Sequence, residues 1–213
     1  MFELITAGGG MMLPIIIASI LALAIILERL YALQRRRVMA GNPVATVQGW
    51  MEYGDLTAQR IHALGQSSKL GQILAAGLAV VDKPALMRTR MEDAGRHVAF
   101  EMERYLNTLG TIALISPLLG LLGTVIGIID VFQAITTTAG AGAVNPEVLA
   151  GGIAKALVTT AAGIIVAVPA FVFHRYFRGL VEELLVDMER QAHQVVELAE
   201  KRAMNPGAAK QQG

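Results

Sequence analysis

Residues 117–127 read PLLGLLGTVIG, and this stretch decides how the chain folds. It carries no charge, and helical spacing would place Gly120, Gly123, Thr124 and Gly127 on roughly one side. Small residues let helix backbones approach closely, which is how helices associate where lipid offers no hydrophobic contrast. A hydroxyl on such a face, in the middle of hydrocarbon, is a candidate functional group. The stretch therefore predicts the packed inner face of a membrane helix bundle.

Three uncharged apolar segments are long enough to cross a bilayer, since a membrane helix needs about 20 residues. They are residues 4–27, 111–129 and 156–173. The first is preceded by Glu3 and followed by arginines, the reverse of a cleaved signal peptide, so we interpret it as a retained anchor. The prediction is an all-α integral membrane protein with three transmembrane helices.

The arginines and lysines predict the orientation of these helices. Arginines flank one end of every span, whereas the loop over 136–152 contains no Lys or Arg. The positive-inside rule then puts the N-terminus outside and the C-terminus in the cytoplasm.

The predicted organisation of the chain has seven segments. They are a transmembrane helix over 1–28, a cytoplasmic helical region over 29–110, a second transmembrane helix over 111–135, an external loop over 136–152, a third transmembrane helix over 153–174, a cytoplasmic helical extension over 175–206 and a disordered tail over 207–213.

The two cytoplasmic regions carry helical patterns of their own. The apolar run over 70–81 is too short to span and predicts a buried or interfacial helix. Apolar residues recur every three or four positions over 87–109, which predicts an amphipathic helix running straight into the second span. A similar stripe over 177–199 extends the third span, so that long helices reach into the cytoplasm. These stripes could pack within one subunit or between subunits.

The third span has a small-residue stripe of its own, made of Ala156, Thr160, Gly163, Ala167 and Ala170, with Thr159 beside it. The threonines have two interpretations. In the first, the threonine hydroxyls bond the backbone of their own helix at i−4 and only help packing. In the second, Thr124 and Thr160 face one cavity from two helices. Pro117 and Pro169 are tolerated in membrane helices where neighbouring groups satisfy the carbonyls they release, and most such prolines are simple kinks.

None of the three uncharged spans contains Asp, Glu, Lys, Arg or His. A threonine hydroxyl does not hold a proton near neutral pH, so an ion-driven process would need a titratable group from a second polypeptide. Zero cysteines exclude disulfides and thiolate metal sites, and the four histidines lack metal-ligand spacing. We therefore expect no metal, no cofactor, no enzyme active site and, at a net charge of +1, no nucleic-acid partner.

Two charges sit at the edges of the spans, Asp130 after the second and Lys155 before the third. The predicted topology puts both near the outer interface, where they either pair with each other or are separately solvated.

The sequences SPLLGLLGTVIGIIDVF and GGIAKALVTTAAGIIVAVPAFVFHRYF resemble the signature of the MotA/TolQ/ExbB proton-channel family. The three-span layout with a long first cytoplasmic segment is similar to the ExbB/TolQ branch. The resemblance implies a homopentamer around a pore in the bacterial inner membrane, with a periplasmic N-terminus. It also implies a single-span ExbD- or TolR-like partner inside the pore, whose membrane aspartate takes up and releases protons.

The resemblance further implies a TonB- or TolA-like transducer as a partner, and with TonB the complex would drive outer-membrane transport. TolQ-type envelope maintenance and gliding motility are alternatives within the family, and a structural membrane scaffold is an alternative of another class. By motif position Thr124, Thr160 and the adjacent Thr159 would line the ion path. The small-residue faces and the two span prolines, rather than the resemblance, predict the helix-packing residues, which are Gly120, Gly123, Gly127, Gly163, Pro117 and Pro169. Many members carry Glu where this chain has Lys155, so any proton-handling role of that Glu does not transfer here.

Overall fold

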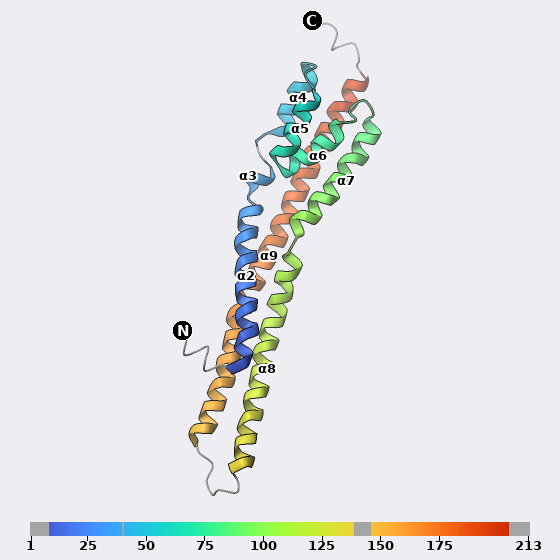
Figure 1. The fold of residues 1–213 in the computed structure, drawn as a ribbon. Helices are drawn as coiled ribbons and strands as arrows, with labels where there is room; N and C mark the ends of the chain where they lie inside the picture. Colours follow the sequence, from blue (N-terminus) through green and yellow to red (C-terminus); the bar gives the residue numbers. More distant parts are fainter. Residues whose placement is uncertain (1–8, 40, 139–145, 205–213) are drawn as a thin grey trace. The chain divides into compact units, whose positions relative to one another are not determined.

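The structure, a computed structural model, describes residues 9–39, 41–138 and 146–204 (Figure 1). Over these residues it contains helices and no strand, which confirms the all-α prediction. The elements are η1 (Gly9–Met11), α2 (Met12–Ala32), α3 (Arg35–Val38), α4 (Pro43–Glu52), α5 (Ala58–Ser67), α6 (Lys69–Leu78), α7 (Pro84–Glu103), α8 (Leu106–Thr138) and α9 (Pro146–Met204). The start of the first span and the tail expected over 207–213 lie outside the described residues.

Three helical stretches are long and apolar enough to cross a membrane, as the sequence predicts. One runs through α2, one contains α8 and one lies in α9. The chain divides into two compact units, to which α2 and α9 both contribute. The first unit is Met1–Glu28 with Tyr105–Tyr176, and the second is Arg29–Arg104 with Phe177–Gly213.

Along the middle of α8, in the first unit, large apolar side chains face outward and glycines face inward. On α8 the exposed residues include Leu118, Leu121 and Val125, whereas Gly120, Gly123 and Gly127 are buried. Burying glycine while exposing leucine is the reverse of a water-soluble core. It is the distribution expected of helices that pack backbone to backbone inside lipid.

In the second unit the packing follows the opposite pattern. The run expected over 70–81 forms α6, whose N-cap Ser68 accepts a hydrogen bond from the backbone N–H of Gly71 at 3.0 Å. Leu70, Leu74 and Leu78 on this helix are at most 1% exposed. The stripes of α7 and α9 are buried in the same unit, through Met87, Met91, Val98 and Met102 on α7 and Phe177, Val181, Leu184, Met188 and Val195 on α9. The amphipathic stripes are therefore buried within a single chain.

The helix expected to run straight into the second span is broken. α7 ends at Glu103, Arg104 takes an extended conformation with ψ of 138°, and Tyr105 adopts a φ of +62°. A left-handed conformation at a residue other than glycine costs roughly 1–3 kcal/mol, so its surroundings must hold it in place. No proline or glycine marks the break, which is why the apolar periodicity did not reveal it.

A buried arginine from the first helix caps α7 just before this break. Arg29 is 5% exposed, and its Nη1 donates hydrogen bonds to the carbonyls of Glu101 at 3.3 Å and Met102 at 3.0 Å. The last carbonyls of a helix have no partner in the helix itself, and a cation near them is favoured by the helix dipole. Arg29 thus stabilises the end of α7 where the chain leaves the helical path.

Candidate functional site

The two small-residue stripes meet where α9 packs along α8, in what we call the α8–α9 seam (Ser116, Gly120, Gly123 and Gly127 with Ala156, Thr159, Thr160 and Gly163). A Cβ atom placed on Gly120 would lie 3.0 Å from the Cα of Thr160. One placed on Gly123 would lie 2.5 Å from the Thr159 hydroxyl oxygen. Only glycine permits this separation of the two backbones, because the space a side chain would need is already filled.

The close approach continues toward both ends of the seam. A Cβ on Gly127 would lie 3.1 Å from that of Ala156, and one on Gly163 would lie 2.5 Å from the carbonyl oxygen of Ser116. Ser116 is 0% exposed, and its hydroxyl donates to the carbonyl of Ile112 at 2.7 Å. Sequence reasoning missed Ser116, although it stands one helical turn before Gly120 and so belongs to the same stripe.

Thr160 is the seam threonine that reaches the other helix. Its hydroxyl donates to the carbonyl oxygen of Gly120 on α8 at 3.2 Å, and its side chain is half-buried. A polar bond across two membrane helices contributes on the order of 1 kcal/mol. The i−4 interpretation therefore does not describe Thr160.

The other two threonines bond their own helices. Thr124 donates to the carbonyl of Leu121 at 2.6 Å and is half-buried at the edge of the seam. Thr159 donates to the carbonyl of Ala156 at 2.8 Å and, more weakly, to that of Lys155 at 3.2 Å. Because Thr159 is 1% exposed, it lies deepest of the three, against Gly123.

Neither proline interrupts its helix. α8 continues through Pro117, which is half-buried, and α9 continues through Pro169, which is exposed. Pro117 lies beside Ser116 at one end of the seam, whereas Pro169 faces outward among apolar side chains.

Lys155 and Asp130 form an ion pair between α9 and α8. The Nζ of Lys155 lies 3.2 Å from Asp130 Oδ2, and the two side chains are 34% and 50% exposed. The stem of Lys155 passes over Gly9, whose φ of +64° and missing Cβ leave room for it. One lysine therefore links the start of the first helix to the facing ends of the other two.

The described residues hold no group of three or more His, Cys, Asp or Glu side chains that could bind a metal ion. The seam itself offers hydroxyls and backbone carbonyls and no titratable side chain. Its chemistry is therefore close helix packing and hydrogen bonding.

Comparison with known proteins identifies the family of this chain. The model of the MotA/TolQ/ExbB proton channel family matches residues 66–190. A Synechocystis protein named ExbB-like 1, after the biopolymer transport protein ExbB, is 33% identical over 185 residues, or 86% of this chain and 70% of that protein. The biopolymer transport protein exbB1 of Vibrio cholerae is 52% identical over 65 residues, or 30% of this chain and 28% of that protein. ExbB of Salmonella typhimurium is 35% identical over 123 residues, or 57% and 48% of the two chains. The chain therefore belongs to the MotA/TolQ/ExbB proton channel family, on its ExbB-like branch.

Proposed function

We propose that this chain is the pore-forming subunit of an inner-membrane motor driven by the proton-motive force, of the ExbB–ExbD type. The observation that carries the proposal is the complete absence of titratable residues from three apolar spans in a member of a proton channel family. Because such spans cannot hold a proton, the proton-carrying group comes from a second polypeptide. A single-span ExbD- or TolR-like partner with a membrane aspartate supplies it.

The ion path lies between subunits, because the α8–α9 seam of one chain is filled at the level of backbone atoms. In this proposal the chain forms a homopentamer, and the partner helices occupy its pore. Thr124 and Thr160, both half-buried at the seam, face the partner's aspartate. Thr159 belongs to the same set but lies deepest, so its substitution should alter packing first.

The proposed orientation places the N-terminus and the segment over 136–152, which includes the end of α8 and the start of α9, in the periplasm, with the regions over 29–110 and 175–206 in the cytoplasm. This follows from the arginines at one end of each span and the lack of Lys and Arg in the loop. One charge crossing 100 mV releases about 2.3 kcal/mol, so a few protons per step suffice to move a partner helix.

The driven process is TonB-dependent uptake through the outer membrane. The names of the relatives favour this over TolQ-type envelope maintenance or gliding motility, because they are called biopolymer transport proteins ExbB. A structural scaffold, whose small-residue faces only mediate assembly, is the alternative of another class.

The first experiment is native mass spectrometry of the chain in detergent, expressed alone and together with a single-span ExbD- or TolR-like protein. The expected result is a homo-oligomer that captures fewer copies of the partner than of itself. A stable oligomer that takes up no partner would leave the complex without a titratable group and would favour the scaffold.

Thr124→Val then separates a channel from a scaffold, because it removes the hydroxyl and keeps the side-chain volume. We expect normal assembly with the partner and at least a tenfold loss of proton flux into proteoliposomes, measured with a trapped pH-sensitive dye. Thr111→Val is the matched control, since Thr111 is an exposed threonine of α8 that also bonds its own helix, to the carbonyl of Asn107 at 2.9 Å. Equal flux in the two variants would contradict a pore role for Thr124.

A further inference from the structure

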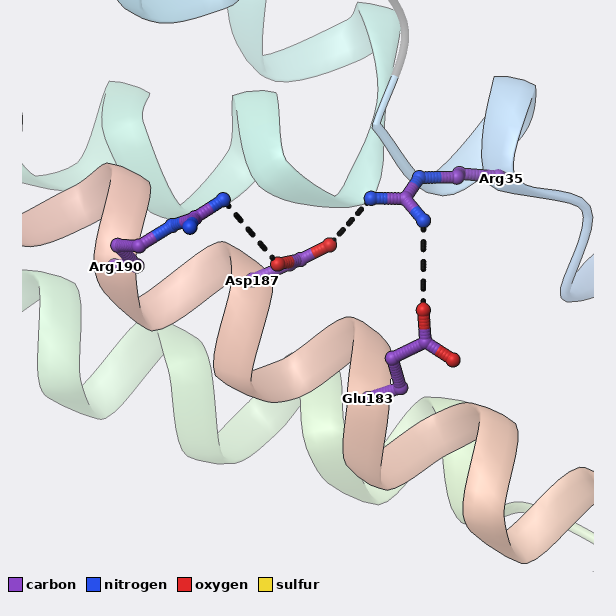
Figure 2. A network of polar contacts seen from close by, with 4 residues as sticks. All are labelled: Arg35, Glu183, Asp187 and Arg190. Atoms are coloured by element: carbon purple, nitrogen blue, oxygen red, sulfur yellow. Dashed lines mark hydrogen bonds and ion pairs between the residues drawn. The ribbon is translucent and has the colours of Figure 1, made fainter.

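Three consecutive arginines follow the first membrane helix, and the first of them pairs with carboxylates of α9. Arg35 on α3 places its Nη1 3.5 Å from Glu183 Oε1, and its Nη2 contacts Asp187 (Figure 2). Asp187 also faces Arg190 on its own helix, at 3.5 Å. Arg35 therefore links α3 to α9, and both of its terminal nitrogens already have carboxylate partners.

The other two arginines have different surroundings. The guanidinium of Arg37 lies 3.7 Å from the centroid of the Tyr31 ring and also contacts the Tyr31 hydroxyl. Arg36 is exposed, and within the described part of the chain neither Arg36 nor Arg37 forms an ion pair with a carboxylate. Among the described residues, two adjacent guanidinium groups thus have no carboxylate partner, and one of them, that of Arg37, is held against an aromatic ring.

Tyr31 sets the depth of this pair relative to the membrane. It follows Leu27, the last residue of the apolar span, by four residues, or about 6 Å along a helix. The headgroup layer on each side of a bilayer is roughly 5–8 Å thick, and tyrosine is enriched there. Because Arg37 folds back onto Tyr31, its charge lies at the level of lipid phosphates.

We propose that Arg36 and Arg37, oriented by Tyr31, bind the phosphate of an anionic phospholipid headgroup. A guanidinium can donate two parallel hydrogen bonds to a phosphate, and Arg37 uses only one of its five N–H groups on the Tyr31 hydroxyl, so others remain for the phosphate. Arg35 does not take part because its partners are Glu183 and Asp187. This lipid site is independent of the proposed ion path, since it involves none of the seam residues.

The test uses the full-length chain reconstituted in phosphatidylcholine membranes with spin-labelled phosphatidylglycerol as the probe. Electron paramagnetic resonance measures the fraction of motionally restricted lipid, and labelled phosphatidylcholine gives the reference. The wild type should prefer phosphatidylglycerol, and the preference should fall roughly fivefold for each arginine removed in Arg36→Gln and Arg37→Gln. Tyr31→Leu, which removes the ring from beneath Arg37, should cause a partial loss.

The matched control is the double variant Arg88→Gln with Arg96→Gln, which removes the same charge from exposed positions of α7. Each of these arginines already lies within 4 Å of a carboxylate, Glu92 at 3.8 Å and Asp93 at 3.7 Å. We expect the control to retain the lipid preference. An equal loss in the control, or an unchanged preference without Arg36 and Arg37, would overturn the site. Displacement of the labelled lipid by inorganic phosphate, and not by chloride at the same ionic strength, would show a soluble anion as the ligand instead.

Discussion

The α8–α9 seam of the first unit and the core of the second unit bury opposite kinds of side chain. In the α8–α9 seam the buried residues are Gly, Ala, Ser and Thr, and leucines face outward. In the second unit α6, α7 and α9 bury Leu, Met, Val and Phe, and charged residues face outward. Burial of a leucine stabilises a protein in water by roughly 1.5–3 kcal/mol, but lipid is as apolar as leucine itself. The difference shows that each unit is built for its own solvent.

The contrast implies that the seam and the second unit are destabilised by opposite changes in side-chain volume. The second unit should be weakened by removing side-chain volume, because its stability comes from apolar burial. The seam should be weakened by adding volume, because its stability comes from close backbone contact. Substitutions of matched size test both statements.

The largest effect is expected from emptying the core of the second unit. Leu74 on α6 is 0% exposed, so Leu74→Ala should lower the free energy of unfolding by about 2–5 kcal/mol through lost burial and the cavity left behind. Thermal unfolding followed by circular dichroism measures this in detergent. Leu86→Ala is the control, because Leu86 on α7 is 39% exposed and should change stability little. Equal losses of unfolding free energy in Leu74→Ala and Leu86→Ala would mean that burial does not determine how much each leucine contributes to stability.

The next effect comes from filling the seam. Gly163→Leu puts a Cβ 2.5 Å from the Ser116 carbonyl oxygen, a backbone atom that cannot move aside, and overpacking of this kind costs about 1–3 kcal/mol. Gly179→Leu is the control on the same helix, since nothing lies within 4 Å of its Cβ position. Thermal unfolding and size-exclusion chromatography should show a loss for Gly163→Leu alone. If Gly163→Leu is as stable as the control, close contact between the two backbones does not exclude a side chain from the seam.

A smaller effect is expected at the ion pair between Lys155 on α9 and Asp130 on α8. Lys155→Ala leaves Asp130 without its partner, so it should be less stable than the double variant Asp130→Ala with Lys155→Ala. Both side chains are partly exposed, which limits the coupling energy to about 0.5–1 kcal/mol. A double-mutant cycle on thermal stability measures it. Strictly additive losses would mean that the two charges are separately solvated.

An effect of similar small size concerns a partly exposed ion pair in the second unit. The hydrogen bond from Lys69, on α6, holds the pKa of Glu101, on α7, below its ordinary value of 4.5. Folding lowers the pKa of Glu101, so the pair stabilises the fold at a pH above the ordinary pKa. This stabilisation is lost as the pH falls through the lowered pKa of the folded state. Partial exposure keeps the contribution under about 1 kcal/mol.

Lys69→Met isolates this contribution from the other carboxylates. The stability gap between the wild type and Lys69→Met should be present at neutral pH and should close at a pH well below 4.5. Urea unfolding at the two pH values measures the gap. A gap of the same size at both would mean that Lys69 acts through packing and not through its charge.

Much of this organisation could be predicted from residue spacing. Glycines three or four positions apart predicted the α8 face, and the stripe of Ala156, Thr160 and Gly163 predicted its counterpart. Periodicity works here because a helix repeats every 3.6 residues in any solvent. It does not say which carbonyl a hydroxyl will choose, so it could not separate Thr160, which bonds α8, from Thr159, which bonds its own helix.

The sequence by itself determined the three apolar spans, the small-residue faces and the lack of a titratable group in the membrane, since these depend on local composition and helical repeat. Tertiary structure alone decided where the long helix breaks. The left-handed Tyr105 follows a helix end that is capped by Arg29, more than seventy residues away in the chain. A local pattern carries no record of such a partner, because the energy that offsets the strained backbone comes from a contact that exists only after folding.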